Sequence, residues 1–285
     1  MSEVRSRWVK AQGVKTHYVE SGDGDNVLIA LHGGGAGSSG ASGMGRVLPL
    51  LGENLRVLAP DSIGGFGQTD PSAPAPYGLI SRAQHTGDFI DALCLDQVSL
   101  LGNSQGAWSA IYYAMQHPDR VKKLVIVSSL TIAGSMGLSQ PPNAAMKALM
   151  GYDGTREGMR KLLEALIIDP AQITDALIDA RQAAASRPGA YEAFQQMAKA
   201  IDYVKKHPVL SMQTDWRQAL PRLTESVPTL IIWGKNDTFA LPETGQALAD
   251  LLPAAQIAWV DGAGHQVQTD APETTARLIQ EFLSA

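Results

Sequence analysis

The sequence has little charge, almost no cysteine and no long apolar run. Charged residues make up 18 % of its 285 residues, and the formal net charge is -5. An acidic chain of this kind gives no reason to expect nucleic acid or an anionic membrane as a partner. Met1–Lys10 is charged and lacks the apolar stretch of a signal peptide, and no run reaches the roughly 18 consecutive apolar residues of a membrane span. We therefore expect a cytoplasmic protein without a membrane segment.

Cys94 is the only cysteine, so no internal disulfide can form and a reducing compartment is compatible with the chain. We interpret it as a small core residue. No group of His and Cys residues has the spacing of a metal site, and neither a metal nor a cofactor is expected. The 45 % apolar content and the length suffice for a sizeable core, in one large domain or two smaller ones.

Short apolar runs and helical patterns alternate along much of the chain. Val27–Leu31 contains no polar residue, which is typical of a strand that is covered on both faces of a parallel sheet. The alternation predicts an α/β protein with a mostly parallel, doubly wound sheet. Further strands are expected at Val14–Val19, Arg56–Pro60, around Leu100, and at Leu124–Val127, Val227–Gly234 and Gln256–Val260, and helices at Ile80–Leu93, Ala107–Met115 and Pro272–Leu283.

The pattern changes between Ile132 and about Leu220, where continuous apolar strands are absent. Amphipathic helical spacing replaces them, interrupted by prolines such as Pro142, Pro170 and Pro188. The sequence therefore predicts a core in two parts, residues 1–131 and 221–285, and a helical lid inserted at residues 132–220.

Ser104 is the proposed nucleophile, because it lies in Gly102-Asn103-Ser104-Gln105-Gly106 between an apolar strand and a helix. A sharp strand-to-helix turn strains the backbone of its central residue, and the flanking glycines give that residue room while its hydroxyl stays exposed. The helix begins at the same place, so its free amides and positive dipole end face a developing negative charge. Such pentapeptides also occur by chance, so the assignment depends on its surroundings.

A glycine-rich loop, His32-Gly33-Gly34-Gly35, follows the buried strand Val27–Leu31. Glycines at a strand end let backbone amides approach a ligand closely, as an oxyanion hole requires. We expect the two donors to be the amides of Gln105, which follows the nucleophile, and of Gly34. A flexible linker would rarely follow a buried strand, and a phosphate-binding loop would need a Gly-Lys-Ser/Thr sequence that is not present.

Asp237 and His265 each lie just past the end of a predicted buried strand. In open α/β sheets the site forms beyond the carboxyl ends of the strands, so both side chains would meet Ser104 there. A serine hydroxyl needs a base, and a histidine oriented by a carboxylate supplies one. The chain order Ser104, Asp237, His265 is that of α/β-hydrolases. The other histidines, His17 among them, have no comparable setting.

With these motifs, the whole chain resembles the α/β-hydrolase family and, more closely, the meta-cleavage product hydrolases, which cut carbon–carbon bonds in ring-fission products of aromatic degradation. The resemblance implies an α/β-hydrolase fold with a helical lid. The family usually has a tryptophan where this chain has Gln266, and often an asparagine where it has Gly43. The matching segments are Leu31–Gly35, Gly102–Gly106, Ile173–Gln182, Gly234–Phe239 and Gly264-His265, and the implied pocket residues are Gly33, Gly35, Asn103, Phe239 and Gln266.

Arg181 matches the lid arginine that holds the substrate's carboxylate and oxo-enol end in that family. Its own setting supports this role, because a helix opened by Thr174 or Asp175 places Arg181 on an apolar face beside Ile178. An unpaired buried charge would be costly, and a substrate carboxylate held by two parallel hydrogen bonds would offset that cost. Alternatively, the arginine reaches solvent or pairs with Asp179 or another acid of the lid.

These observations lead to one main hypothesis and two alternatives. The resemblance implies hydrolysis of a 2-hydroxy-6-oxohexa-2,4-dienoate-type substrate, in which His265 helps to ketonise the dienol and Ser104, or a water that it activates, attacks the distal ketone. The same triad would serve a carboxylic ester or lactone hydrolase. A ligand receptor without turnover is the third interpretation. The partner is in each case a small molecule, expected to bear a carboxylate, and a homo-oligomer is compatible with the sequence.

Overall fold

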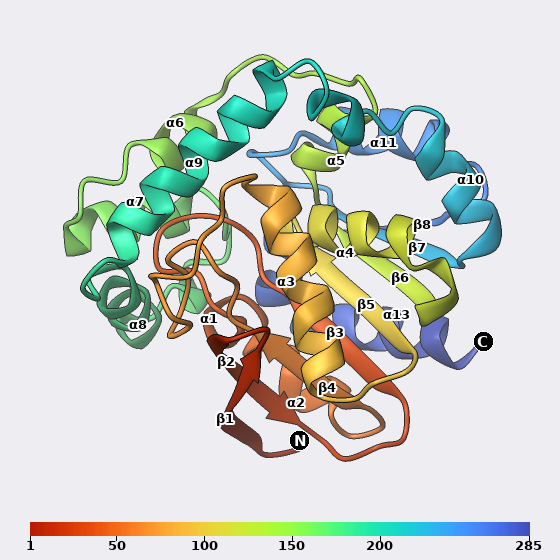
Figure 1. The fold of residues 1–285 in the computed structure, drawn as a ribbon, viewed down its shortest axis with the longest axis horizontal. Coiled ribbons are helices and arrows are strands. Elements are labelled where there is room, and N and C mark those ends of the chain that lie inside the picture. The colour runs from red at the N-terminus through yellow and green to blue at the C-terminus, as the bar shows by residue number, and fades with distance from the viewer.

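The computed structural model describes residues 1–285 and has an eight-stranded sheet at its centre (Figure 1). The strand order is β1-β2-β4-β3-β5-β6-β7-β8. β1 pairs with β2 and β2 with β4 in antiparallel fashion, and all other pairs are parallel. The predicted mostly parallel sheet is thus confirmed. The strands are β1 Val4–Ala11, β2 Val14–Ser21, β3 Val27–Leu31, β4 Arg56–Pro60, β5 Val98–Asn103, β6 Val121–Val127, β7 Thr229–Gly234 and β8 Gln256–Val260.

Helices cover both faces of the sheet, with α3 and α4 in front of it in Figure 1 and α13 behind it. None of the helices is both long enough and apolar enough to cross a membrane. The helices are α1 Gly40–Met44, α2 Leu48–Leu51, α3 Leu79–Ala92, α4 Gln105–Gln116, α5 Leu130–Ser135, α6 Ala144–Met150, α7 Arg156–Glu164, α8 Asp175–Ala185, α9 Ala190–Lys206, α10 Ala219–Ser226, α11 Pro242–Asp250, α12 Val267–Asp270 and α13 Pro272–Ser284.

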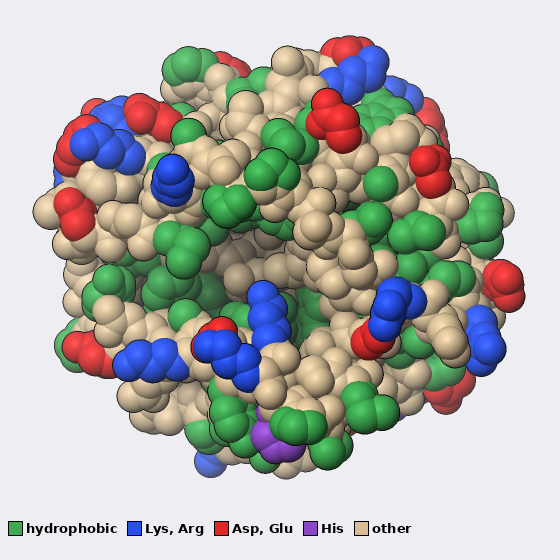
Figure 2. All heavy atoms as spheres, turned by 90° about the horizontal axis from the view of Figure 1, so that it is seen from above, with side chains coloured by type: hydrophobic (Ala, Val, Ile, Leu, Met, Phe, Trp, Pro, Cys, Tyr) green, Lys and Arg blue, Asp and Glu red, His purple; other side chains and the backbone are tan.

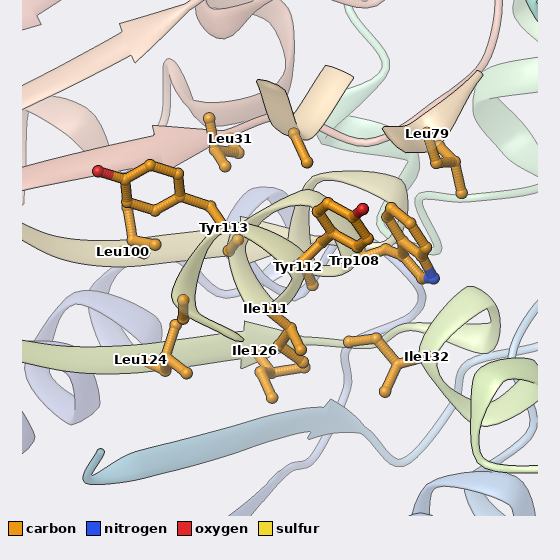
Figure 3. Packing of buried hydrophobic residues seen from close by; sticks show 14 of the residues in the cluster. Leu31, Leu79, Leu100, Trp108, Ile111, Tyr112, Tyr113, Leu124, Ile126 and Ile132 are labelled. Atoms are coloured by element: carbon orange, nitrogen blue, oxygen red, sulfur yellow. The ribbon is translucent and has the colours of Figure 1, made fainter. Parts of the chain in front are cut away.

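The apolar strands bury side chains on both faces, and each face has its own core. In β3, Ile29 and Leu31 pack with residues of α3 and α4, whereas Leu28 and Ala30 pack with residues of α1, α2 and α13. Figure 3 shows the first of these cores, where Trp108 and Ile111 of α4 lie over the strands. This alternation follows from the two-residue period of a strand.

The segment between β6 and β7 contains no strand, and its α-helices are α5 to α10. Residues of α7 and α8, including Leu162, Leu163 and Ile178, form a third apolar cluster that also contains Ala36 from the glycine-rich loop. In Figure 1, α6 to α9 lie together beyond the ends of the strands, beside the loop that follows β3. α7 and α8 therefore have a small core of their own, whereas Met197 of α9 and Leu220 of α10 pack with the core on the sheet.

Three details differ from the expectations drawn from the sequence. β1 was not predicted, because it is an edge strand whose side chains are mostly exposed and give no apolar pattern. Cys94 is exposed, not part of the core, because it lies in the turn after α3 with φ of 53° while its neighbours Leu93 and Leu95 pack inward. Gly43 lies within α1 rather than in a pocket loop, and a Cβ there would contact His32.

Candidate active site

Ser104 lies at the turn between β5 and α4, with φ of 54° and ψ of -119°. Its N–H donates to Val127 O over 3.0 Å, and its carbonyl accepts from Ser129 Oγ over 2.8 Å. One backbone and one side-chain hydrogen bond hold this strained conformation in place. Gly106 has no room for a side chain, since a Cβ there would lie 2.1 Å from Leu31 O. The local backbone is therefore the strand-to-helix turn that the motif predicts.

Asp237 and His265 form a buried hydrogen-bonded pair beyond the ends of β7 and β8. His265 Nδ1 lies 2.9 Å from Asp237 Oδ2, and the two residues are 3 % and 2 % exposed. The other oxygen, Oδ1, accepts from the amides of Phe239 and Ala240, each at 2.8 Å. A neutral imidazole that donates from Nδ1 keeps its free lone pair on Nε2, which is the atom a general base uses.

Ser104 and His265 line one cavity of about 470 Å³ between the sheet and the inserted helices. No hydrogen bond joins Ser104 Oγ to the imidazole, although such bonds often shorten only in the Michaelis complex. Leu149 of α6 and Ile201 of α9 contribute to the wall, and Lys205 is its only Lys, Arg, Asp or Glu side chain. Figure 2, which views the molecule from the side of these helices, shows a surface hollowed near its centre among mostly uncharged side chains.

Two residues whose backbone amides could hold an oxyanion, Gly34 and Gln105, line the same cavity. Gln105 is the first residue of α4, so its N–H has no acceptor within the helix. The N–H of Gly34 has no backbone acceptor either. The two residues are adjacent, because a Cβ on Gly34 would lie 2.6 Å from Cδ of Gln105. The geometry thus places both predicted donors beside Ser104.

The expected pocket residues fall into two groups. Gly33, Asn103, Phe239 and Gln266 line the cavity, whereas Gly35 and Arg181 do not. Asn103 does more than line it, because its Nδ2 donates to the carbonyl of His265 over 3.0 Å. The Phe239 ring lies 4.5 Å from the His265 ring, centroid to centroid. Both contacts hold the histidine loop against the end of the sheet.

Arg181 lies one layer behind the wall and is completely buried. A Cβ on Gly35 would be 3.1 Å both from Arg181 Nη2 and from Leu149, which lines the cavity. Nη2 donates to Ala36 O over 3.0 Å, but Nε and Nη1 have no partner. Burial lowers the pKa of Arg181 to about 10. The alternatives of a solvated arginine or a pair with Asp179 are wrong, since Asp179 pairs with Arg156 over 2.6 Å.

The expectation that no other histidine has a comparable setting is wrong for His17. His17 Nδ1 lies 2.8 Å from Asp61 Oδ2, and its Nε2 lies 2.8 Å from Ser6 Oγ. Asp61 follows the carboxyl end of β4, a position that could have drawn attention to it. Ser6, however, lies in the regular edge strand β1 and not at a strand-to-helix turn. This second Ser–His–Asp chain ties β1, β2 and the loop after β4 together.

A family model described as the alpha/beta hydrolase family matches residues 28–278. The match runs from the second residue of β3 into α13 and includes every predicted site residue. The chain therefore belongs to the α/β hydrolase family, and the fold class predicted from the sequence is confirmed.

Its relatives narrow this class to the meta-cleavage product hydrolases, which confirms the predicted resemblance. It is 32 % identical to 2-hydroxy-6-oxo-6-(2'-aminophenyl)hexa-2,4-dienoic acid hydrolase of Metapseudomonas resinovorans, over 98 % of this chain and 90 % of that one. It is also 32 % identical to 2-hydroxymuconate semialdehyde hydrolase of Pseudomonas sp. strain CF600, over 98 % and 93 %. A mutant of the meta-cleavage product hydrolase CumD of Pseudomonas fluorescens IP01 superposes with a TM-score of 0.80 at 28 % identity, over 98 % and 97 %.

Proposed function

We propose that the protein hydrolyses a carbon–carbon bond in a 2-hydroxy-6-oxohexa-2,4-dienoate-type ring-fission product of aromatic degradation. The observation that carries the choice of reaction is the similarity, over nearly the full length, to enzymes named for substrates of this type. The site supplies what hydrolysis needs, because a carboxylate-bound histidine and the serine turn open on one cavity. An ester or lactone hydrolase with the same triad is not favoured by these relatives.

In the proposed mechanism, His265 first helps to move a proton so that the dienol becomes a ketone. His265 Nε2 then takes the proton of Ser104, or of a water that Ser104 activates, as oxygen attacks the distal carbonyl carbon. The carbonyl oxygen becomes negative and is held by the amides of Gln105 and Gly34. When the tetrahedral carbon collapses, the carbon–carbon bond breaks and the expelled carbanion, delocalised into the dienoate, takes up a proton. If Ser104 was the nucleophile, water then hydrolyses the acyl–Ser104 ester and restores the hydroxyl. By either route a dienoic acid fragment and a carboxylic acid leave.

Arg181 is the proposed anchor of the substrate carboxylate. Two of its nitrogens are buried without a partner, and a Cβ on Gly35 would contact both its Nη2 and Leu149 of the cavity wall. A carboxylate is the group that a guanidinium binds with two parallel hydrogen bonds. We therefore infer that Leu149 yields when substrate binds, so that the acid end of the molecule lies toward α8 and the scissile bond lies over Ser104.

We further propose that residues 132–220 act as a lid over a core made of residues 1–131 and 221–285. The wall of the cavity supports this division, since Leu149, Leu166, Ile201 and Val204 come from the insertion and Ser104 and His265 from the core. A cytoplasmic location fits a catabolic enzyme of this kind, and a homo-oligomer is compatible with the proposal.

The test is a steady-state assay on a panel of ring-fission products beside a panel of neutral aryl esters, with the Ser104→Ala variant as the blank. We expect kcat/KM for at least one ring-fission product to exceed kcat/KM for every ester in the panel. Brisk ester hydrolysis with all ring-fission products at the Ser104→Ala background would support the ester hydrolase instead. If a fluorophosphonate probe does not label Ser104 in folded wild-type protein, the result would support a ligand receptor without turnover.

A further inference from the structure

Arg82 of α3 is completely buried, and nothing in the triad accounts for it. Its guanidinium donates from Nη1 to Gln105 Oε1 over 3.0 Å and from Nη2 to the carbonyl of His32 over 2.9 Å. Both acceptors are uncharged and no acid forms an ion pair with Arg82, and burial lowers its pKa to about 9. An unpaired buried charge is usually worth less to stability than a well-packed apolar side chain of similar volume.

The two acceptors of Arg82 belong to the two halves of the expected oxyanion hole. Gln105 begins α4 and contributes one amide, and His32 immediately precedes the loop that contributes the other. The side-chain amide of Gln105, held by Arg82, is also the surface against which Gly34 lies, at 2.6 to 2.8 Å from a Cβ placed on that glycine. The arginine therefore joins, through one planar group, two segments that are distant in the sequence.

The environment of His32 supports the same arrangement. Burial and, after it, the charge of Arg82 hold the pKa of His32 well below its usual value, so the ring is neutral. It can then donate from Nδ1 to Gly33 O over 2.7 Å and accept at Nε2 from the amide of Ser62 over 3.1 Å. The centre of the Phe66 ring lies 5.2 Å from the centre of the His32 ring and 4.7 Å from the guanidinium carbon of Arg82.

We propose that Arg82 is a positioning residue that fixes the oxyanion hole by hydrogen-bonding the Gln105 side chain and the His32 carbonyl at the same time. It does not line the cavity and touches no reacting atom. Its effect falls on the transition state, because the amides bind the oxygen only after it becomes negative. The proposal rests on the proposed function only in that Ser104 is the nucleophile, and Ser104→Ala tests that point separately.

The experiment compares Arg82→Met, Arg82→Lys and a control on the same helix, Phe89→Leu, which removes buried apolar contacts away from the loop. The concentration of competent sites is first measured by fluorophosphonate titration. Per competent site, Arg82→Met is expected to lower kcat about 10- to 100-fold, less than the roughly 10²- to 10³-fold of a deleted donor, with KM within about 3-fold. Phe89→Leu is expected to lower Tm and to leave kcat per site within about 2-fold.

A second readout separates positioning from a merely structural role. Phenylboronic acid binds to an active serine as a tetrahedral anion, so its inhibition constant should rise in Arg82→Met by the same factor as kcat falls. The inhibition constant of benzoate, which resembles a product, should change by less than about 3-fold. An unchanged boronate constant, or a kcat per site within about 2-fold of wild type, overturns the proposal.

Arg82→Lys keeps the charge but cannot bond both acceptors in a planar fork. We expect its kcat per site to stay at least about 5-fold below wild type, and full activity would overturn the proposal even if Arg82→Met fails to fold. In the double variant Arg82→Met/Gln105→Leu, kcat should fall by less than the product of the factors for the two single variants, because the two residues act together. Fully multiplicative losses would also contradict it.

Discussion

Replacing Arg181 with methionine should raise stability and abolish most of the activity toward acidic substrates. Arg181 is fully buried, with Nε and Nη1 unpaired. Its pKa of about 10 means that the folded protein holds this proton less tightly than the unfolded chain does. At about 1.4 kcal/mol for each pKa unit, the cost to folding is on the order of 3 kcal/mol. This cost is fully present at neutral pH and is lost only as the pH rises above about 10.

Methionine removes that cost, but it leaves the carbonyl of Ala36 without its hydrogen-bond donor. The lost hydrogen bond lowers the free energy of unfolding by about 1 kcal/mol. We therefore expect Arg181→Met to raise the free energy of unfolding by about 1 to 2 kcal/mol and Tm by roughly 2 to 8 °C. The loss of a buried charged partner costs a bound carboxylate about 3 to 5 kcal/mol. This corresponds to a fall in kcat/KM of about 10²- to 4 × 10³-fold for a ring-fission product, while a neutral aryl ester should change by less than about 3-fold.

The assay follows the absorbance of the dienolate and the release of the aryl alcohol, with thermal unfolding measured on the same samples. Arg156→Met is the matched control, since Arg156 lies exposed on α7 and pairs with Asp175 and Asp179. Its activity should stay within about 2-fold of wild type, because exposed ion pairs contribute only about 0 to 1 kcal/mol. Equal losses for acid and ester in Arg181→Met, or full activity toward the acid, would refute the role of Arg181 as carboxylate anchor.

Three further predictions concern the triad and its backbone. Asp237→Asn should lower kcat about 10⁴-fold through loss of the correct histidine tautomer, as in other triads, and a fall of less than tenfold in steady-state turnover would be inconsistent with its role. A fluorophosphonate should modify Ser104 and not Ser6, whose hydroxyl also contacts a histidine, so that mass spectrometry of Ser104→Ala finds no label; a label on Ser6 would show that the oxyanion donors do not decide reactivity. Gly106→Ala should destabilise the protein by at least about 2 kcal/mol in denaturant unfolding, because its Cβ would lie 2.1 Å from Leu31 O. Gly134→Ala in α5, with nothing within 4 Å of the added carbon, should instead be neutral or stabilising, and equal losses in the two variants would refute the steric argument.

The sequence alone was sufficient for the parts of the molecule that depend on short segments. An apolar run such as Val27–Leu31 is typical of a strand covered on both faces, and five strands after it were located within a few residues of their observed bounds. The turn around Ser104 was predictable because the motif is contiguous in the sequence, and a Cβ on Gly102 would clash with Ala107 of the following helix. The space at Gly106 is limited instead by Leu31 of β3, which is remote in the sequence. Asp237 and His265 were predictable because the strands that precede them are parallel, so their carboxyl ends meet at one edge.

Only the tertiary structure decided how deeply the charged and polar side chains lie and which groups they meet. Arg82 and His32 are 50 residues apart and Asn103 and His265 are 162 apart, and no periodicity in the chain relates such pairs. The exposure of Cys94, the chain from Ser6 through His17 to Asp61, and the place of Arg181 behind Gly35 are of the same kind. Secondary structure follows from the pattern of nearby residues, whereas burial and hydrogen-bond partners are set by packing between elements that are remote in sequence.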